Sequence, residues 1–383
     1  MLNLKEKFFA LIRYAITGEK LPEDFACDKN SIEELFKLSS AHDITSITAY
    51  ALEKNGLLSD CPTSARMRDE LLFSVGRITL LEYFSEEVFD SLDQAEIDYV
   101  PLKGAVLRKL YPRDFFRTSS DLDMLVKKED FDRACAVLKE KLNLKEKYRS
   151  SHDLAMNRSE METVEVHYSL LEEDRAKGCF DILKDAWKYA RLVKGHRYEF
   201  SEEFFKFYHV AHMLKHFEQA GCGIRFFIDL YFLRGFGDRK VFSDMLAAHG
   251  LLKFYDVCEK IVDHVVYGIE PDKLTVKTEN FVLKAGIYGN VDNYVTIGQK
   301  QRGGKFRYLW SRAFLPYAQL KEFYPKLEGR KWLTPYYELK RWLQMIFGGK
   351  MKKKLAEVKR LNAYDEKKAN EIMELFGELE VTD

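Results

Sequence analysis

Several features that would assign a function directly are missing from this sequence of 383 residues. It has no Gly-x-x-x-x-Gly-Lys-Ser/Thr loop, no Gly-x-Gly-x-x-Gly dinucleotide fingerprint and no Gly-x-Ser-x-Gly elbow. No apolar run reaches the roughly 18 residues of a membrane span, and the charged N-terminal stretch lacks the apolar core of a signal peptide. We therefore expect a cytoplasmic protein that uses none of these three kinds of site.

Close cysteine pairs and net charge are also lacking. The six cysteines are scattered, which is typical of a reducing compartment where cysteine serves as a small buried hydrophobe. The 61 Lys and Arg residues balance 61 Asp and Glu residues, so the total charge indicates no partner. With 46% hydrophobic residues the chain can form a substantial core, and its length allows two or three domains.

Hydrophobic spacing predicts a small α/β unit between helical regions. Apolar residues recur at helical spacing before residue 95 and again, almost without interruption, from about residue 181 onward. Between them, period-two patterns predict strands near 97–102, 121–126 and 160–170, with a further strand possible at 144–149 and a helix over 128–142. We predict an α/β (α+β) fold with a small mixed sheet. Its expected parts are a helical N-terminal region, 1–95, an α/β core, 96–195, and a helical C-terminal domain, 196–383.

The stretch from Tyr99 to Val126 is the centre of this interpretation. It reads YVPLKGAVLRKLYPRDFFRTSSDLDMLV, a strand that breaks at a Lys-Gly turn, a short helix, a loop and a second strand. On that second strand Asp121 and Asp123 point the same way, because side chains repeat every second residue. Two carboxylates spaced by about 7 Å of strand are costly without a positive partner. A divalent metal ion is one such partner, and salt-bridged or solvated aspartates at a strand edge are the alternative.

A third carboxylate, Glu165, lies on the strand around METVEVHYSL, with His167 on the same face. Nucleotidyl transfer uses two cations about 3.5 to 4 Å apart, and paired strand aspartates with a carboxylate on a neighbouring strand can hold them. A glycine turn before a helix, here at Gly104, lets backbone amides approach phosphate oxygens. The order of these elements predicts a nucleotidyltransferase site if the two strands are neighbours.

The same residues resemble the uncharacterised nucleotidyltransferase family of the polymerase β-like nucleotidyltransferase superfamily. The motifs are Lys-Gly, Leu-Tyr, Arg, Asp-Leu-Asp-Met-Leu-Val and Glu-Val-His over residues 103–167, continued by HVAHMLKHFEQAGCGIRFFIDLYFL over 209–233. The resemblance implies Mg²⁺ or Mn²⁺ held by Asp121, Asp123 and Glu165. It also implies transfer of a nucleoside monophosphate from a nucleoside triphosphate to an acceptor, with release of pyrophosphate.

The resemblance further implies that the Gly104 turn binds phosphate. The wider superfamily has Gly-Ser or Gly-Gly there, whereas this chain has Gly104-Ala105, so a serine hydroxyl is missing. Lys103 can compensate as a point charge on phosphate, or it can simply be a solvent-facing lysine at a strand end. The loop residues Ser119 and Ser120 are expected to bind phosphate as well.

Two further candidates near the carboxylates have alternative roles. Arg117 can bind phosphate or neutralise Asp121 and Asp123, and either role places it in the site. His167 can orient a ligand or the attacking group, or it can be a buried, hydrogen-bonded histidine.

Residues of the 209–233 segment are candidates for the cleft. His209, His212 and His216 share one helix face, which is compatible with zinc but equally with helix packing. Arg225 and Asp229 have the spacing of an ordinary i, i+4 ion pair. The resemblance suggests instead that this pair, with Lys215 and His216, lines the nucleotide or acceptor side of the cleft.

Basic and aromatic residues are interleaved near the C-terminus. Residues 298–361 contain 17 Lys or Arg against 4 Asp or Glu. This pattern suits an RNA or other anionic surface, and the alternative is a solvated helical face with its aromatic residues in the core. The acceptor therefore stays open among a small molecule, RNA and protein. Two other functions also stay open, a non-catalytic nucleotide-binding or scaffold protein and an RNA-binding helical protein.

Overall fold

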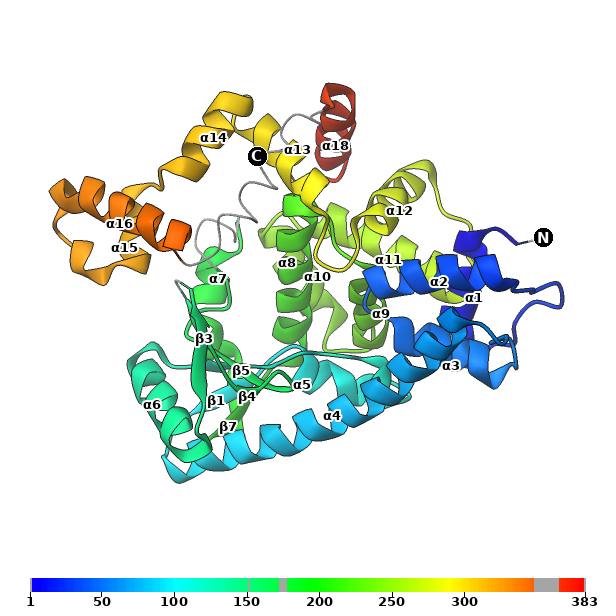
Figure 1. Ribbon diagram of the computed structural model, residues 1–383, viewed down its shortest axis with the longest axis horizontal. Coiled ribbons are helices and arrows are strands. Elements are labelled where there is room, and N and C mark those ends of the chain that lie inside the picture. Colours follow the sequence, from blue (N-terminus) through cyan, green and yellow to red (C-terminus); the bar gives the residue numbers. More distant parts are fainter. Residues whose placement is uncertain (1, 151, 172–177, 348–364, 382–383) are drawn as a thin grey trace.

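A computed structural model of the chain describes residues 2–150, 152–171, 178–347 and 365–381. A seven-stranded mixed sheet lies among helices, which confirms the predicted α/β class with helical flanks (Figure 1). The strand order is β3-β4-β5-β2-β1-β7-β6. The strands are β1 (Tyr99–Pro101), β2 (Leu122–Val126), β3 (Lys145–Arg149), β4 (Asp153–Ser159), β5 (Glu162–His167), β6 (Ala190–Lys194) and β7 (Arg197–Phe200).

Two central strands bring the predicted carboxylates together. β2 pairs in parallel with β5, in a register that sets Asp123 opposite Glu165, and β1 pairs antiparallel to β2 on the other side. The strand neighbourhood on which the carboxylate prediction depended is therefore present. The face that Asp123 and Glu165 share follows from the period-two pattern, because Met124 and Val166 are fully buried on the opposite face.

That opposite, apolar face is covered by two helices. The long α4 (Pro62–Gln94) and α6 (Phe131–Leu142), both predicted as helices, pack on it. Phe89 of α4 stacks on Tyr99 of β1 with ring centroids 5.2 Å apart. Because one face is filled by these helices, the acidic side chains of β2 and β5 are directed to the other face.

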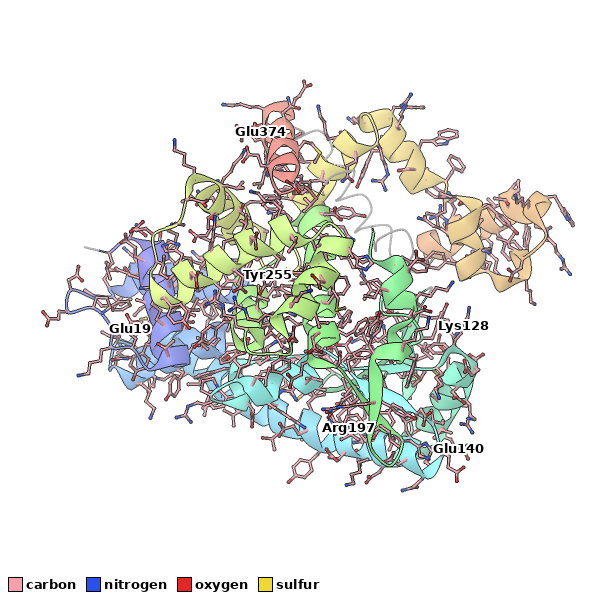
Figure 2. All side chains as sticks on the ribbon, turned by 180° about the vertical axis from the view of Figure 1, so that it is seen from behind. Glu19, Lys128, Glu140, Arg197, Tyr255 and Glu374 are labelled. Atoms are coloured by element: carbon pink, nitrogen blue, oxygen red, sulfur yellow. The ribbon has the colours of Figure 1, made fainter. Side chains whose placement is uncertain are left out.

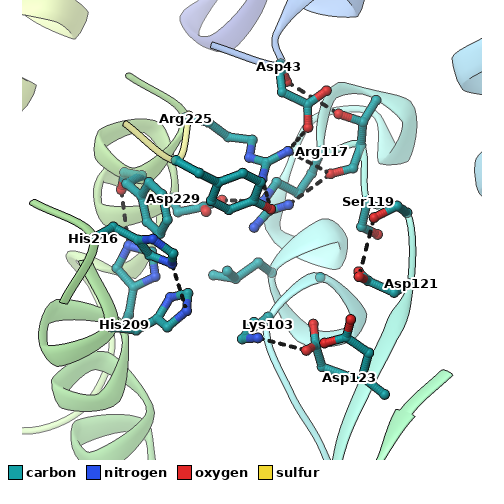
Figure 3. A pocket seen from close by; sticks show the side chains of 18 of the residues that line it. Asp43, Lys103, Arg117, Ser119, Asp121, Asp123, His209, His216, Arg225 and Asp229 are labelled. Carbon is teal, nitrogen blue, oxygen red and sulfur yellow. Dashed lines mark hydrogen bonds and ion pairs between the residues drawn. The ribbon is translucent and has the colours of Figure 1, made fainter. Parts of the chain in front are cut away.

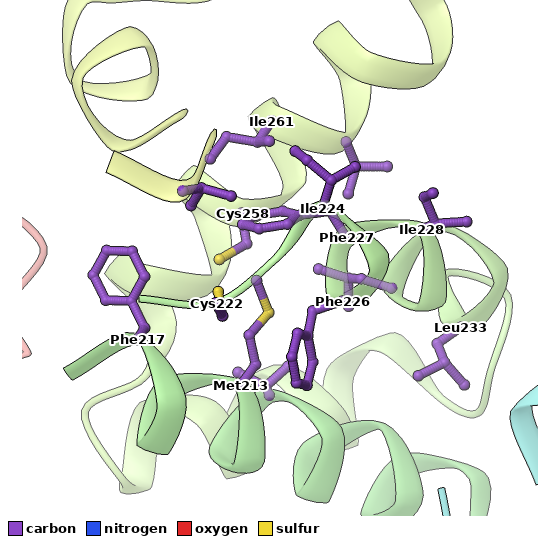
Figure 4. Packing of buried hydrophobic residues seen from close by; sticks show 14 of the residues in the cluster. Met213, Phe217, Cys222, Ile224, Phe226, Phe227, Ile228, Leu233, Cys258 and Ile261 are labelled. Atoms are coloured by element: carbon purple, nitrogen blue, oxygen red, sulfur yellow. The ribbon is translucent and has the colours of Figure 1, made fainter. Parts of the chain in front are cut away.

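The remaining N-terminal helices join the C-terminal helices in one core. They are α1 (Leu4–Thr17), α2 (Lys29–Ala41) and α3 (Thr45–Lys54). The C-terminal helices are α8 (Glu202–Ala220), α9 (Ile224–Leu233), α10 (Arg239–Ala248), α11 (Leu252–Tyr267), α12 (Lys273–Ala285), α13 (Val291–Gln301) and α18 (Glu366–Glu378). Apolar side chains of α8, α9 and α11, among them Met213, Phe227 and Ile261, interlock in this core (Figure 4). None of the described helices has the length and apolarity of a membrane-spanning segment.

Helix α8 begins directly after β7, and both its ends are defined by sequence. The Ser201 side chain caps its start by accepting a hydrogen bond from the Phe204 amide at 3.3 Å, and two glutamates follow in the first turn. Its end is at Gly221, where φ is +99° and a Cβ would lie 2.3 Å from the Ala285 Cβ. Glycine is therefore required at Gly221, both for the backbone conformation and for the approach of α12.

A buried histidine joins three helices and makes stability depend on pH. His42, at the end of α2, accepts a hydrogen bond from the Ile224 amide at Nδ1 and contacts the Leu283 carbonyl through Nε2, both at 3.2 Å. Burial lowers the pKa of His42 to about 4, against the upward effect of the Leu283 carbonyl. The unfolded chain therefore binds a proton on His42 at higher pH than the folded chain does, so stability falls as pH falls from 6.5 to about 4.

We expect His42 to lower the free energy of unfolding by about 3 kcal/mol as the pH falls from 6.5 to about 4. Urea titrations of the parent and of His42→Gln at several pH values measure it. The variant should be less stable at neutral pH and show a flatter dependence below pH 6.5. His249→Gln, which changes a less buried histidine, should keep the parental slope, and an unchanged slope in His42→Gln would contradict the assignment.

Three strands were not predicted, and the domain boundary at residue 195 stays a prediction. β4 begins at Asp153, before the strand predicted near 160–170, and β6 and β7 lie in the region expected to be almost entirely helical. Because β7 pairs with β1, the sheet continues past the predicted boundary at residue 195 to Phe200. Short helices complete the core: α5 (Gly104–Leu107), α7 (Phe180–Lys184) and the 3₁₀ turns 108–110, 114–116, 128–130 and 186–189.

Three further helices form an arm that extends away from the sheet (Figures 1 and 2). They are α14 (Lys305–Ala313), α15 (Tyr317–Phe323) and α16 (Thr334–Phe347), and we call residues 305–343 the basic arm. A small cluster around Leu320, Leu327 and Tyr337 holds α15 and α16 together. The predicted basic segment also includes residues 348–361, which lie outside the described residues.

Candidate active site

A cavity of about 510 Å³ lies between the acidic face of the sheet and helices α8 and α9. Every residue that the sequence singled out for the site lines it. These residues are Lys103, Gly104, Arg117, Ser119, Ser120, Asp121, Asp123, Glu165, His167, Lys215, His216, Arg225 and Asp229. Figure 3 shows the carboxylates of β2 and Lys103 facing the histidines of α8 across this cavity. The cavity therefore joins segments that are up to 245 residues apart in the chain, from Asp43 to Tyr288.

The three carboxylates have different electrostatic environments. Burial, followed by the charges of Asp123 and Glu165, raises the pKa of Asp121 to about 7. Burial also raises the pKa of Glu165, and Asp123 adds to the effect. Burial opposes the charge on Asp123 too, but Lys103 and His167 outweigh it and hold the pKa of Asp123 well below its usual range. The cluster therefore favours an additional positive charge, supplied by protons or by a cation.

Lys103 supplies one positive charge directly. Its Nζ lies 2.7 Å from Asp123 Oδ1, and although burial disfavours its charge, that carboxylate holds the pKa of Lys103 well above the usual value. The backbone of Lys103 has a φ of +40°, unusual for a residue with a side chain. The solvent-facing alternative for Lys103 is therefore wrong.

The Gly104 turn touches the serine loop. A Cβ on Gly104 would lie 2.9 Å from Ser119 Oγ, so glycine permits the close approach of the two segments. Ser119 Oγ accepts a hydrogen bond from Arg108 Nη2 at 2.6 Å, and Ser120 Oγ donates to Asp121 Oδ2 at 3.3 Å. A serine hydroxyl thus stands beside the turn, although the residue after Gly104 is alanine.

Arg117 does not neutralise the carboxylates of β2. It pairs instead with Asp229 of α9, Nε to Oδ1 at 2.7 Å, and Tyr111 donates to the same oxygen at 2.7 Å. Both members of the ion pair are buried. This interaction attaches the loop before β2 to the C-terminal helices and places Arg117 on the wall of the cavity.

The expected helix ion pair between Arg225 and Asp229 is likewise wrong, because each side chain has a partner elsewhere. Arg225 Nη1 donates to the Asp43 carboxylate and to the Thr118 carbonyl, the latter at 3.2 Å. Asp43 stands between α2 and α3 with a φ of +53°. Arg225 therefore joins the N-terminal helices, the loop before β2 and α9 at one edge of the cavity.

The three histidines of α8 do not converge on one point. His212 and His216 face each other, Nε2 to Nε2 at 3.2 Å, whereas His209 Nε2 lies 3.0 Å from the Phe226 carbonyl. Burial lowers the pKa values of His209 and His212, so both rings are neutral at pH 7. Among the described residues, the groups whose ligand atoms lie close enough for a metal ion do not include these three. The zinc interpretation of this helix face is therefore not supported.

One group that can hold a metal ion shares Asp123 and Glu165 with the predicted ligand set, with His167 in place of Asp121. Donor atoms of Asp123, Glu165 and His167 all lie within 4.8 Å of one another. His167 Nε2 is 3.1 Å from Asp123 Oδ1, so His167 belongs to the carboxylate cluster. Carboxylate oxygens are the ligands that Mg²⁺ and Mn²⁺ prefer, and the surplus of buried negative charge fits such an ion.

Sequence reasoning missed several residues of the cavity. Tyr148 donates a hydrogen bond to Glu165 from β3. His152 and Asp153 lie beside His167, and Asp43 and Tyr288 contact Arg225. The charged strand β3 and the loop residue Asp43 have no periodic pattern that indicates a buried face. His152 and Asp153 stand out in the sequence as polar residues directly before a short apolar run.

Comparison with known proteins agrees with this geometry. The profile of a family described as uncharacterised nucleotidyltransferase matches residues 28–263, which include the sheet and the helices that line the cavity. Searches of curated proteins and of solved structures gave no match. Since the family profile covers more than half of the sequence, the chain belongs to the uncharacterised nucleotidyltransferase family.

Proposed function

We propose that the protein transfers a nucleoside monophosphate from a nucleoside triphosphate to an acceptor hydroxyl in a reaction that requires Mg²⁺ or Mn²⁺. The carrying observation is the register of β2 and β5, which sets Asp123 beside Glu165 in a cavity that Asp121 and Lys103 also line. The membership of the chain in a nucleotidyltransferase family supports the same reaction class.

The proposed roles follow from position and charge. Carboxylate oxygens of Asp121, Asp123 and Glu165 hold the cations. When bound, these cations activate the incoming hydroxyl and offset the charge of the triphosphate. Lys103 and the Gly104 turn bind the triphosphate, the lysine as a point charge on a phosphate oxygen. The hydroxyls of Ser119 and Ser120 complete this phosphate site and replace the serine that is missing after Gly104.

In the proposed reaction the acceptor oxygen forms a bond to the α-phosphorus as its proton is lost to solvent. The bond from the α-phosphorus to the oxygen that bridges to the β-phosphate breaks, and pyrophosphate leaves with that electron pair. The opposite side of the cavity carries Lys215 together with Arg117 and Arg225, which are paired with Asp229 and Asp43. We place the nucleotide or acceptor against that side, beside His216 and Asp229, with His167 facing it from the carboxylate cluster.

Two measurements distinguish this proposal from a non-catalytic nucleotide-binding or scaffold protein. Calorimetry with ATP, CTP, GTP and UTP in the presence of Mg²⁺ identifies the bound nucleotide. A pyrophosphate-release assay with that nucleotide, supplied with a cell extract as a source of acceptors, measures turnover. Metal-dependent binding together with pyrophosphate release supports the enzyme, whereas binding without release from any fraction would favour the scaffold protein.

We further propose that the acceptor is an RNA, because the basic arm exposes its aromatic rings. Phe306 and Trp310 are 75% and 58% exposed, and Phe306, Trp310 and Phe314 follow one another with ring centroids 6.2 and 4.6 Å apart. Bases of single strands stack on such rings, while basic side chains contact the phosphates. This exposure disagrees with the alternative that the aromatic residues of the arm all lie in the core.

Trp310→Ala should weaken the binding of a labelled single-stranded RNA about 5- to 150-fold, the range that loss of one stacked base gives. Fluorescence anisotropy at several salt concentrations measures both the affinity and its electrostatic part. Tyr83→Ala is the matched control, because Tyr83 is 72% exposed on α4, outside the arm. Equal RNA affinity for the parent and Trp310→Ala would remove the arm from the acceptor site.

A further inference from the structure

Three side chains converge on one point next to the carboxylate cluster. His152 precedes β4, Asp153 begins it, and His167 ends the neighbouring strand β5, where Asp153 and His167 stand opposite each other. All three are more than nine-tenths buried. Donor atoms of the three lie within 4.8 Å of one another. The antiparallel pairing of β4 and β5 therefore builds a buried group of two imidazoles and one carboxylate.

The distances in this group suit a shared cation better than direct hydrogen bonds. Asp153 Oδ2 lies 3.5 Å from His152 Nε2 and 3.7 Å from His167 Nδ1. Hydrogen bonds to nitrogen span about 2.7 to 3.2 Å. Donors on a tetrahedral zinc ion, each about 2.0 to 2.2 Å from the metal, lie roughly 3.4 Å from one another. The separations found here match that second geometry.

Two atoms of the group have no hydrogen-bond partner among the described residues. They are Asp153 Oδ1 and His167 Nδ1, and both are shielded from solvent. A buried acceptor without a partner costs about 1 to 3 kcal/mol, so native structures nearly always satisfy such atoms. One cation between β4 and β5 satisfies His167 Nδ1 and the Asp153 carboxylate together.

The second ring nitrogen of each histidine contacts another side chain, and these two contacts orient both imidazoles toward the same point. His152 Nδ1 lies 3.2 Å from Ser150 Oγ, which leaves Nε2 directed at Asp153. His167 Nε2 lies 3.1 Å from Asp123 Oδ1, which leaves Nδ1 directed at Asp153. Metal-binding histidines commonly use their second nitrogen in this way, with a carboxylate or hydroxyl as its partner.

We propose that His152 Nε2, Asp153 and His167 Nδ1 bind a first-row transition-metal ion, with Zn²⁺ the best fit to two imidazoles and one carboxylate. This site is separate from the proposed cation site at Asp121, Asp123 and Glu165, because it uses the other nitrogen of His167. The bound ion fixes the tautomer of His167 that donates to Asp123 Oδ1. His167 and the ion therefore position Asp123, and the binding itself does not depend on nucleotidyl transfer.

Elemental analysis and calorimetry of the full chain test the proposal. After treatment with a chelator and gel filtration, titration with ZnCl₂ alone should show one tight site per chain in the parent. Loss of a residue that hydrogen-bonds to a metal ligand weakens metal binding roughly 10- to 100-fold. Because His152→Ala and Asp153→Asn each change a ligand itself, each should weaken zinc binding by at least that much. Ser150→Ala, which keeps all three ligands, should give a smaller loss within that range.

Two control variants locate the ion. His212→Ala removes a histidine of the same cavity and should leave zinc affinity unchanged. Asp121→Asn should also retain it, while losing Mn²⁺ affinity at the carboxylate cluster if the proposed function is right. Thermal melts of the metal-free variants identify any that fail to fold, and Ser150→Ala then carries the test. Absence of a tight zinc site in the parent, parental affinity in His152→Ala, or loss of the site in His212→Ala or Asp121→Asn would each overturn the proposal.

Discussion

Replacing Asp123 by Asn should lower kcat for nucleotidyl transfer by about 1,000-fold or more and leave the fold intact. Asp123 is the carboxylate that Lys103 and His167 both contact, at 2.7 and 3.1 Å, and it stands opposite Glu165 in the sheet. The amide keeps the shape of the side chain but removes the charge that is proposed to hold a cation. Pyrophosphate release under saturating nucleotide measures the effect, and circular dichroism checks the fold.

Asp98→Asn is a closely matched control. Asp98 is also held by a lysine and a histidine, Lys127 Nζ at 2.6 Å and His196 Nδ1 at 2.9 Å, but it does not line the cavity. Its variant should keep the parental kcat. Equal losses in the two variants would mean that charge anywhere on the sheet matters, and an active Asp123→Asn would remove Asp123 from the catalytic site.

Replacing Asp229 by Ala should destabilise the protein by about 3 to 5 kcal/mol, the usual cost of removing one partner from a buried ion pair. Arg117 would be left charged and buried, and the Tyr111 hydroxyl would lose its acceptor. The consequence should extend beyond one contact, because this pair attaches the loop before β2 to α9. Urea denaturation at pH 7 measures the change in the free energy of unfolding.

Asp244→Ala provides the comparison for this stability prediction. Asp244 also accepts an ion pair, from Lys240 Nζ at 2.8 Å, but both side chains are exposed on α10. Exposed pairs contribute about 1 kcal/mol or less, so this variant should stay close to the parent. If Asp229→Ala were equally mild, the Arg117–Asp229 pair would not hold the two parts together.

The sequence predicted the elements whose apolar residues gather on one face. β2 and β5 have this pattern, with Leu122, Met124, Val164 and Val166 against α4 and α6, so the direction of Asp123 and Glu165 followed from period two. Their adjacency was a condition of that prediction, and the parallel register of β2 and β5 meets it. The helices α4, α8, α9 and α11 were found for the same reason, since each has an apolar face at helical spacing.

Among the missed strands, β6 lacks such a face. β6 is an edge strand with mostly exposed side chains, ARLVK, so it has no strong hydrophobic pattern. β3, KEKYR, is exposed along its whole length, and it was predicted only as a possible strand. The partners of Arg225 and Asp229 were mispredicted for a different reason. Spacing along a helix identifies neighbours within the helix only, whereas both side chains are buried against segments more than 100 residues away.

Diffraction from crystals soaked with MnCl₂ and a non-hydrolysable nucleoside triphosphate tests the central claim most directly. Anomalous scattering locates the manganese independently of the protein atoms. The account predicts manganese bound to carboxylate oxygens of Asp121, Asp123 and Glu165, with the triphosphate against Lys103 and the Gly104 turn. Manganese absent from these three carboxylates, or a triphosphate bound outside the cavity, would contradict it.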